Sequence, residues 1–307
     1  MMFGLRRKSG QMPLNLASSP GFVAAVQLVP VLGGGRPRLQ LAQVSSSTAS
    51  IAERLDLAMR QTHLKHVPLR ILLEPSEYQF LQAEFPNVPA DELKTAIRWQ
   101  VKDMLRLPLE RVTLDVVPPV EQAQGMRRSQ GFVVAAGNDL LLERMQQFRA
   151  YNAEVQVIDV PEMVQRNFAD LVEEPGRGTA VLSISHNACL LTASREGVLY
   201  FTRAFDLSLV SLAASEVARR EQFDRLVLEL QRSIDVLDRQ LSFLSVSTLW
   251  LTPFQHAGEL LSLLIENLYL PVKLVVLADV FDCSGCSLPA QPDQQAAMFH
   301  ALGLALR

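Results

Sequence analysis

The sequence predicts an α/β protein with a mixed sheet in each half of the chain. Short runs of β-forming residues alternate with amphipathic helical patterns in both halves, which is typical of this class. The length of 307 residues corresponds to about two domains at roughly 150 residues each. With 49% hydrophobic and 20% charged residues, the chain can bury a sizeable core, so a disordered protein is excluded. Both halves begin with several strands followed by a helix, which suggests a distant duplication.

The first half opens with two β-rich runs, 22–32 and 38–44, joined by Gly33-Gly-Gly-Arg-Pro37. Glycines adopt the positive φ of hairpin loops, so these runs predict a hairpin. A phosphate-binding glycine loop is less favoured, because no helix follows and the Lys-Ser/Thr ending is missing. Ser50-Ile-Ala-Glu53 fits a capping box that begins a helix. The other elements expected in this half are strands at 67–73, 112–117, 131–136 and 155–160 and helices at 91–107 and 138–150.

The second half begins after Glu173-Glu-Pro-Gly-Arg-Gly178, a charged run with helix breakers that predicts a linker. Beyond it we expect strands at 179–185, 188–193 and 198–204, followed by a long helical region that ends at Leu244. Apolar residues in this region recur every three or four positions, as in a coiled-coil seam, but a helix packed on a sheet has the same pattern. The last expected elements are strands at 247–251 and 272–276 and helices at 257–268 and 292–306.

Charge and cysteine content exclude several classes of protein. A net charge of -3 and a pI near 6.0 argue against a nucleic-acid partner. Three cysteines cannot form a disulfide framework, which favours a reducing, cytoplasmic location. The apolar stretch 21–32 is too short for a membrane span, which needs about 20 residues. Residues 1–12 carry Arg6, Arg7 and Lys8 and predict a flexible basic N-terminus with at most weak contact to anionic lipid.

Enzyme motifs are missing from the sequence. Cys283-Ser-Gly-Cys286 has thioredoxin spacing, but no helix begins promptly after it, and a zinc site would need two further ligands at matching spacing. We therefore expect two reduced thiols in a loop and no metal. The histidines His186, His256 and His300 have no recognisable nucleophile beside them, and no G-x-S-x-G, HExxH or Walker A pattern occurs.

Seven runs, in order along the chain, resemble landmarks of the PilM-type proteins, which are actin-like cytoplasmic components of type IV pilus machines. The runs are Ala96-Ile-Arg-Trp-Gln-Val-Lys-Asp-Met-Leu-Arg-Leu-Pro108, Val112-Thr-Leu-Asp-Val116, Phe132-Val-Val-Ala-Ala136, Val157-Ile-Asp-Val-Pro-Glu-Met163, Phe201-Thr-Arg203, Leu228-Glu-Leu-Gln-Arg-Ser233 and Ala301-Leu-Gly-Leu-Ala-Leu-Arg307. The Trp-Gln-Val-Lys-Asp and Val-Ile-Asp-Val-Pro-Glu-Met runs look most like the MshI branch, from mannose-sensitive haemagglutinin (MSHA) pilus biogenesis. The resemblance extends from about Leu14 over nearly the whole chain, and its specificity comes from the order and spacing of the runs.

This resemblance implies an actin/Hsp70-like fold of two α/β lobes with a nucleotide cleft between them. It implies that residues 13–77 and 137–172 form the first lobe, 78–136 a small inserted α+β subdomain of the SHS2 type, and 173–307 the second lobe. It also implies a partner, because PilM-type proteins hold the short cytoplasmic N-terminal tail of PilN, a bitopic inner-membrane protein. The counterpart of PilN for the MshI branch is MshJ. The expected function is a cytoplasmic scaffold that this partner holds at the inner membrane, among other pilus assembly proteins.

The resemblance also shows where the nucleotide cleft departs from the actin-like pattern. That pattern has two hairpins with Asp/Glu-x-Gly followed by Ser, Thr or Gly, whose backbone N–H groups approach the phosphates. In Leu14-Asn-Leu-Ala-Ser-Ser19, Asn15 replaces the acid and Ala17 the glycine, followed by Ser18 and Ser19. In Leu182-Ser-Ile-Ser-His186, Ser183 replaces the acid and Ser185 the glycine. A lysine is missing from Phe22-Val-Ala-Ala-Val26, and Thr252-Pro-Phe-Gln-His256 stands in place of a Gly-Gly near the adenosine.

Together these departures remove the magnesium-handling acids, the close backbone approach and a phosphate counter-charge. We therefore expect a pseudo-ATPase with a degenerate cleft and no cofactor. Weak binding of ATP with magnesium stays open, because Ser18, Ser19 and Ser183 can still donate hydrogen bonds. One alternative is a functional actin-like ATPase of the pilus machine. Another is an unrelated α/β enzyme such as a sugar kinase, for which no acidic catalytic base is evident.

The exposed edge of the 91–107 helix is the expected contact for the partner tail, with Arg98 and Trp99 as candidate residues. The opposing interpretation is that Arg98 is simply solvated and that Trp99 packs in the core. Trp99 and Trp250 both lie on apolar periodicities, so the sequence favours core packing for both.

Overall fold

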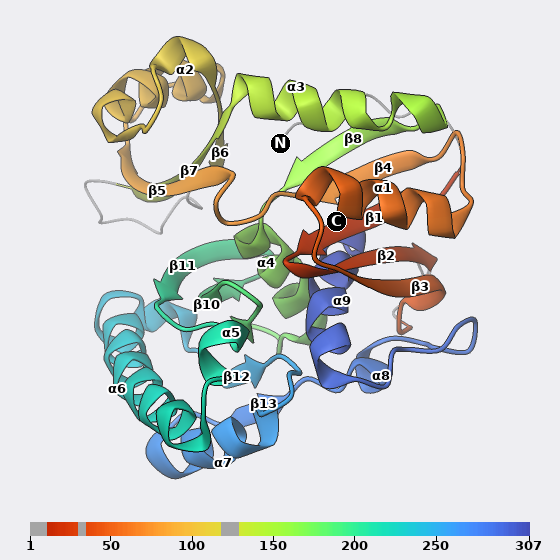
Figure 1. Cartoon of the computed structure of the whole chain (residues 1–307). Helices are drawn as coiled ribbons and strands as arrows, with labels where there is room; N and C mark the ends of the chain where they lie inside the picture. Colours follow the sequence, from red (N-terminus) through yellow and green to blue (C-terminus); the bar gives the residue numbers. More distant parts are fainter. Residues whose placement is uncertain (1–10, 30–34, 118–128) are drawn as a thin grey trace.

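The computed structural model describes residues 11–29, 35–117 and 129–307, and this part of the chain contains three β-sheets (Figure 1). The first sheet consists of β1 (Leu14–Ser19), β2 (Gly21–Val29), β3 (Arg38–Ser47), β4 (Pro68–Leu72) and β8 (Glu154–Asp159). The second sheet consists of β9 (Thr179–Ile184), β10 (Cys189–Arg195), β11 (Val198–Phe205), β12 (Thr248–Leu251) and β13 (Val272–Leu274). We call the parts built on these two sheets the first and the second lobe.

The two five-stranded sheets have the same topology. Their strand orders are β3-β2-β1-β4-β8 and β11-β10-β9-β12-β13. In each sheet, three consecutive strands pair antiparallel. The first of these three then pairs in parallel with a strand that follows a helix, and one more parallel strand completes the sheet. A mixed sheet in each half is therefore confirmed, and the shared order is the one that a duplicated organisation predicts.

Helices cover both faces of each sheet. On the first sheet, α1 (Ile51–Thr62) and α3 (Asn138–Gln147) pack on one face and α9 (Pro292–Ala305) packs on the other. On the second sheet, α6 (Glu216–Gln240) and α7 (Ala257–Asn267) cover one face and α4 (Pro161–Val172) covers the other. The shorter helical elements are α5 (Leu209–Leu212), α8 (Leu277–Val280) and the 3-10 turns η3 (Arg149–Tyr151) and η4 (Ser242–Leu244).

The helices α4 and α9 cross each other between the lobes (Figure 1). Helix α4 directly follows β8 of the first sheet but packs on β9 and β10 of the second, whereas α9 follows the second sheet and packs on β1 and β2. At the crossing, a Cβ atom on Gly303 would lie 2.5 Å from Cγ1 and 2.6 Å from the carbonyl oxygen of Val164, so only glycine permits this approach. Each lobe thus takes a helix from the other half of the chain. The domain limits expected from the sequence, 13–77 with 137–172, 78–136 and 173–307, stay a prediction.

A third sheet, β5-β7-β6, extends from one end of the first lobe (Figure 1). It is antiparallel and consists of β5 (Tyr78–Phe85), β6 (Val112–Val117) and β7 (Ser129–Gly137). Between β5 and β6 lie α2 (Ala90–Gln100) and the 3-10 turns η1 (Lys102–Met104) and η2 (Leu109–Arg111). One face of this sheet shares a core with Ile97 and Val101, while the other face joins the core of the first lobe. We call this part, from β5 to β7, the inserted subdomain.

Most of the expected elements are confirmed. The hairpin is formed by β2 and β3, with loop residues 30–34 outside the described part of the chain, and the Ser50 capping box begins α1: Glu53 N donates to Ser50 Oγ at 3.3 Å, and Ser50 N donates to Glu53 at 2.9 Å. The sequence prediction does not include the strands β1 and β5 or the helices α4 and α8. Three helix ends are wrong. The helices expected over 91–107 and 138–150 end at Gln100 and Gln147, and the one expected to reach Leu244 ends at Gln240, each followed by a 3-10 turn.

Candidate functional site

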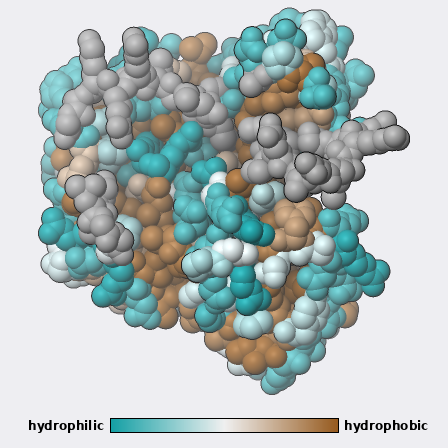
Figure 2. All heavy atoms as spheres, turned by 180° about the vertical axis from the view of Figure 1, so that it is seen from behind, coloured by the Kyte–Doolittle hydropathy of each residue, from teal (hydrophilic) through white to brown (hydrophobic). Residues whose placement is uncertain are grey.

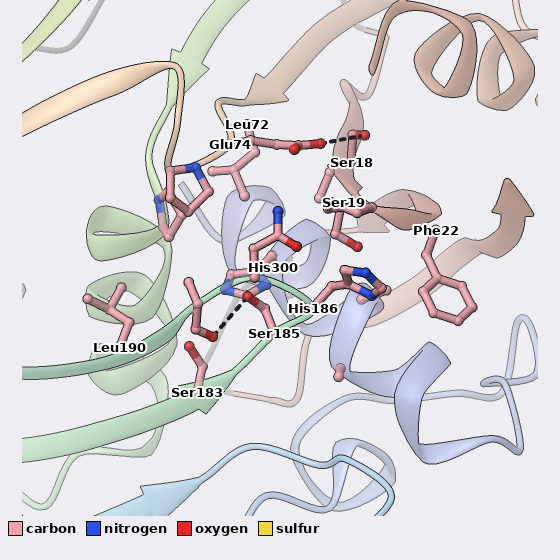
Figure 3. A pocket seen from close by; sticks show the side chains of 18 of the residues that line it. Ser18, Ser19, Phe22, Leu72, Glu74, Ser183, Ser185, His186, Leu190 and His300 are labelled. Atoms are coloured by element: carbon pink, nitrogen blue, oxygen red, sulfur yellow. Dashed lines mark hydrogen bonds between the residues drawn. The ribbon is translucent and has the colours of Figure 1, made fainter. Parts of the chain in front are cut away.

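A cavity lies between the two lobes, where the β1–β2 turn faces the β9–β10 turn (Figure 3). Its volume is about 100 Å³. Gly21 forms the first turn with a φ of +87°, and a methyl group there would lie 3.8 Å from the His186 imidazole of the second turn. The side chains that the two turns and their strands contribute to the lining include Ser18, Ser19, Phe22, Ser183, Ser185 and His186.

Five of the six residues expected to form degenerate phosphate loops line this cavity: Ala17, Ser18, Ser19, Ser183 and Ser185. Asn15 does not line it. This residue is buried on β1, and its Nδ2 donates to the backbone oxygens of Val26 (3.0 Å) and Pro13 (3.2 Å). Its amide therefore holds the β1–β2 hairpin instead of facing a ligand.

The Ser18 hydroxyl belongs to a buried ion-pair network in the first lobe. Arg54 on α1 donates from Nη2 to Glu74 at 2.6 Å and from Nε to Ser18 Oγ at 2.8 Å. Ser18 Oγ in turn donates to Glu74 Oε1 at 3.0 Å (Figure 3). Burial raises the pKa of the Glu74 carboxyl, and this effect exceeds the opposing influence of Arg54 and Ser18. The Ser18 hydroxyl, one of the hydroxyls expected to donate to a phosphate, is thus already engaged within the protein.

The Ser183 hydroxyl is engaged in the same way in the second lobe. It accepts a hydrogen bond from Nε2 of Gln165, a fully buried side chain of α4. Gln165 Oε1 accepts from Thr192 Oγ1 at 2.8 Å, so one amide connects α4 to two strands of the second sheet. Ser185 donates to the Ala188 oxygen of its own turn at 3.0 Å.

The segment after β12, where the resemblance predicts a Gly-Gly pair, carries a core residue instead. Where the resemblance leads us to expect two glycines, Phe254 is only 2% exposed and packs edge-on against Phe223, with ring centroids 6.4 Å apart. The neighbouring Gln255 N donates to Asp293 on α9 at 3.0 Å. This segment therefore belongs to the contact between the second lobe and α9.

The electrostatics of the cavity are unfavourable for a polyphosphate. None of the described residues that line it is a lysine or an arginine, whereas Glu74, Glu162 and Asp293 do line it. Burial raises the pKa of Glu162 to about 7 and lowers the pKa of His300 to about 4, so His300 is neutral at physiological pH. In the described part of the chain, no group of three His, Cys, Asp or Glu side chains is placed to hold a metal ion. The cavity thus lacks the cations that phosphate binding uses.

Comparison with family models and with curated proteins gives no match. Solved structures do match. The PilM-PilN type IV pilus biogenesis complex contains a chain that matches with a TM-score of 0.74 and 20% identity, over 96% of this chain and 98% of that one. A Bacteroides thetaiotaomicron protein described as having an actin-like ATPase fold and unknown function matches with a TM-score of 0.51 and 11% identity, over 95% and 96%. The chain has an actin-like ATPase fold.

In this actin-like fold, the inserted subdomain carries the two residues predicted to contact a partner. Arg98 is half-buried, and its Nη2 donates to the Leu109 oxygen at 2.7 Å, which holds the η2 turn. Trp99 is 64% exposed, so the expectation of core packing is wrong for it. Helix α2 ends one residue later, and Ile97 and Val101 already fill the core beneath it. Trp250 is half-buried, with the Lys273 ammonium 5.4 Å from its ring.

A second cavity lies where the inserted sheet joins the first actin-like lobe. It has a volume of about 220 Å³, and its lining includes Tyr78, Gln79, Arg106, Leu107 and Gly137. Gln79 fixes one wall, because its side chain accepts from Arg106 N at 2.7 Å and donates to the Met104 oxygen at 3.1 Å. We call this the junction cavity.

The two cysteines of the CxxC run are free thiols in a turn, where Cys286 N donates to the Cys283 oxygen at 3.3 Å. Burial raises the pKa of both thiols, which disfavours the reactive thiolate.

The hydrogen-bond networks around the cleft between the lobes use Arg54, Glu74, Glu162 and Gln165, which were not identified from the sequence. Only Arg54 offered a signal, because it is a charged residue beside Leu55 and Ala58 on the buried face of α1. The partners of the other three lie on distant segments, such as Tyr78 for Glu162, which no spacing rule connects.

Proposed function

We propose that this chain is a scaffold component of a type IV pilus assembly machine that binds the cytoplasmic N-terminal tail of a PilN-like, bitopic inner-membrane protein. The observation that carries the proposal is the match to the PilM-PilN complex, which extends over 96% of this chain and 98% of that chain. The finer assignment, an MSHA-type machine with an MshJ-type partner, is supported by the runs that resemble the MshI branch.

We place the partner tail on the inserted subdomain, within residues 78–136, and along the junction cavity. An extended peptide needs an apolar surface with a few polar anchors. The 42% exposed Leu107 side chain offers apolar surface there, beside the wall that the Gln79 side chain fixes. Trp99 at the edge of α2 is available for a further contact, whereas the Arg98 guanidinium serves the η2 turn.

We propose further that the cleft between the lobes does not hydrolyse ATP. The internal engagement of Ser18 and Ser183, the acidic lining and the small volume all support this. A cavity of about 100 Å³ is well below the roughly 300–1,000 Å³ of typical small-molecule sites. The residues present do not fit ATP with magnesium, so no catalytic step is assigned to them.

The proposed location is the cytoplasm, at the inner membrane and held there by the partner. Within the described residues, no helix combines the length and the apolar character that crossing a bilayer requires. The longest one, α6, carries charged residues throughout.

Calorimetry and hydrogen exchange with a synthetic tail peptide of the MshJ-like protein test the partner proposal. We expect saturable binding and slower exchange within residues 78–136. Leu107→Glu should weaken binding, whereas Leu228→Glu, a change of a 55% exposed leucine on α6, should not. Binding that protects a different region would overturn the placement, and a peptide that does not bind would overturn the proposed partner.

Calorimetry with ATP and magnesium tests the cleft. We expect no saturable heat, because the Ser18 and Ser183 hydroxyls are engaged within the protein and none of the described lining residues is a lysine or an arginine. Micromolar binding would instead favour the alternative, a functional actin-like ATPase, and consumption of ATP only with an added sugar would favour a kinase.

A further inference from the structure

The outer end of the inserted subdomain exposes two large apolar side chains within six residues. Trp99 is 64% exposed and Met104 is 48% exposed, at the end of α2 and in the η1 turn. Helix α2 lies at the periphery of the molecule, far from the second lobe (Figure 1). Seen from the opposite side, the inserted subdomain also has hydrophobic side chains at its surface beside hydrophilic ones (Figure 2). Two large exposed side chains so close in the chain, at a protruding end, make this end a candidate interaction surface.

Basic side chains accompany these two residues. Between Arg98 and Leu107 the chain has three basic residues and a single acid, Asp103, although the whole protein has a net charge of -3. Lys102 and Arg106 are exposed. The Lys102 ammonium lies 6.0 Å from the centre of the Trp99 ring, so charge and aromatic surface are presented together.

We propose that this outer face, formed by Trp99, Lys102, Met104 and Arg106, rests on the anionic lipid headgroups of the bilayer that anchors the partner. Tryptophan is enriched at the interface between hydrocarbon and water, because its ring is apolar and its N–H remains solvated. Lysine and arginine beside it are attracted to anionic headgroups. This combination favours a lipid surface over a purely apolar protein groove.

The inference rests on the proposed function and extends it to orientation. Arg106 also lines the junction cavity, so the outer face continues into the site proposed for the tail. A tail that emerges from a membrane span brings its binding module close to the bilayer. Contact between the outer face and the lipid would then fix how the inserted subdomain is oriented relative to the bilayer.

Tryptophan fluorescence of the full-length protein tests this, because the sequence contains only two tryptophans. In the Trp250→Phe variant, Trp99 is the one emitter. With vesicles of phosphatidylethanolamine and phosphatidylglycerol we expect its emission to move to shorter wavelength and its quenching by acrylamide to decrease. Vesicles of phosphatidylcholine should have no such effect. If Trp250→Phe does not fold, the wild-type spectrum minus that of Trp99→Phe provides the same signal.

Charge variants provide the second measurement, by vesicle sedimentation. Replacing both Lys102 and Arg106 by glutamine should weaken binding to anionic vesicles by about tenfold or more. The matched control replaces Arg225 and Arg239, two exposed arginines on α6, by glutamine and should bind as the wild type does.

Two outcomes would overturn the inference. In one, the protein sediments with anionic vesicles while the Trp99 emission stays unchanged, so that another segment binds lipid. In the other, the Trp99 emission responds to the tail peptide but not to vesicles, so that the outer face is a protein-binding surface. Because the vesicles contain no tail peptide, neither outcome bears on the proposed partner, which the peptide-binding experiment tests separately.

Discussion

Tyr78 donates a hydrogen bond of 2.8 Å to Glu162 and so connects the inserted subdomain to the start of α4. Both side chains are buried, with exposed fractions of 8% and 6%. Burial raises the pKa of Glu162 to about 7, with a smaller contribution from the charge of Asp159, and it raises the pKa of Tyr78 as well. A carboxyl group that titrates near neutral pH therefore lies where the inserted subdomain, the first lobe and the start of α4 meet.

Glu162 should make the folded protein less stable as the pH rises from about 4.5 to about 7. Its folded pKa lies above the unfolded value of 4.5, so in this window the folded state binds the proton more tightly and loses that advantage as the pH rises. The effect is on the order of 2–3 kcal/mol. Urea unfolding at about pH 5 and about pH 7.5 should show a larger loss of stability for the wild type than for Glu162→Gln. Equal losses in both proteins would contradict the assignment.

Arg54→Met should destabilise the fold strongly, because it leaves the Glu74 carboxylate buried without its counter-charge. Both side chains are only 6% exposed, and breaking such a pair costs about 3–5 kcal/mol. The double variant Arg54→Met with Glu74→Met should recover most of this loss. As a control, Arg111→Met breaks a largely exposed pair with Asp139 and should change stability by less than about 1 kcal/mol. A double variant as unstable as the single one would show that the arginine acts through packing.

Gly303→Ala should separate α4 from α9. The added Cβ would lie within 2.6 Å of two atoms of Val164, and overpacking of this kind costs about 1–3 kcal/mol. Gly258→Ala on α7 is the matched control, since nothing lies within 4 Å of its added methyl group, and it should stabilise the protein by about 0.5–1 kcal/mol. Thermal unfolding of both variants measures the difference, and equal effects would argue against a tight crossing.

Two of the three thiols should react with a disulfide reagent in the native protein. Cys283 and Cys286 are partly exposed, whereas Cys189 is fully buried on β10 and burial strongly raises its pKa. The first two should react faster as the pH rises, because the thiolate is the reactive form. A colorimetric thiol assay should count the third only after unfolding. Reaction of all three at one rate in the native state would contradict the burial of Cys189.

The alternation of strands and helices made the fold class predictable, but some elements are hidden by local chemistry. Strand β1 carries Asn15, Ser18 and Ser19, which interrupt its apolar pattern, although Asn15 is buried and holds a hairpin. Helix α4 begins at Pro161, which in the sequence suggests a break, whereas proline at the first helical position is well tolerated.

The resemblance could predict which positions lie together, since five of the six expected cleft positions do line one cavity, although the residues there depart from the family pattern and their role stays a prediction. The side-chain networks that engage the Ser18 and Ser183 hydroxyls could not be predicted. Arg54 reaches Glu74 and Gln165 reaches Ser183 only once the sheets and helices are assembled. The error at Trp99 has a different origin. Leu93, Ile97 and Val101 form the core-facing stripe of α2. Trp99 follows Ile97 by two positions and therefore lies on the opposite face.

The crossing of α4 and α9 affects the order in which the lobes fold during synthesis. The strands β1 and β2 leave the ribosome long before α9, so one apolar face of the first sheet stays bare until residues 292–305 have been made. The second sheet has no such delay, because α4 precedes it in the chain. The lobe that is translated last therefore completes its layers first, and the earlier lobe closes only by a contact over a long stretch of chain, which costs loop-closure entropy.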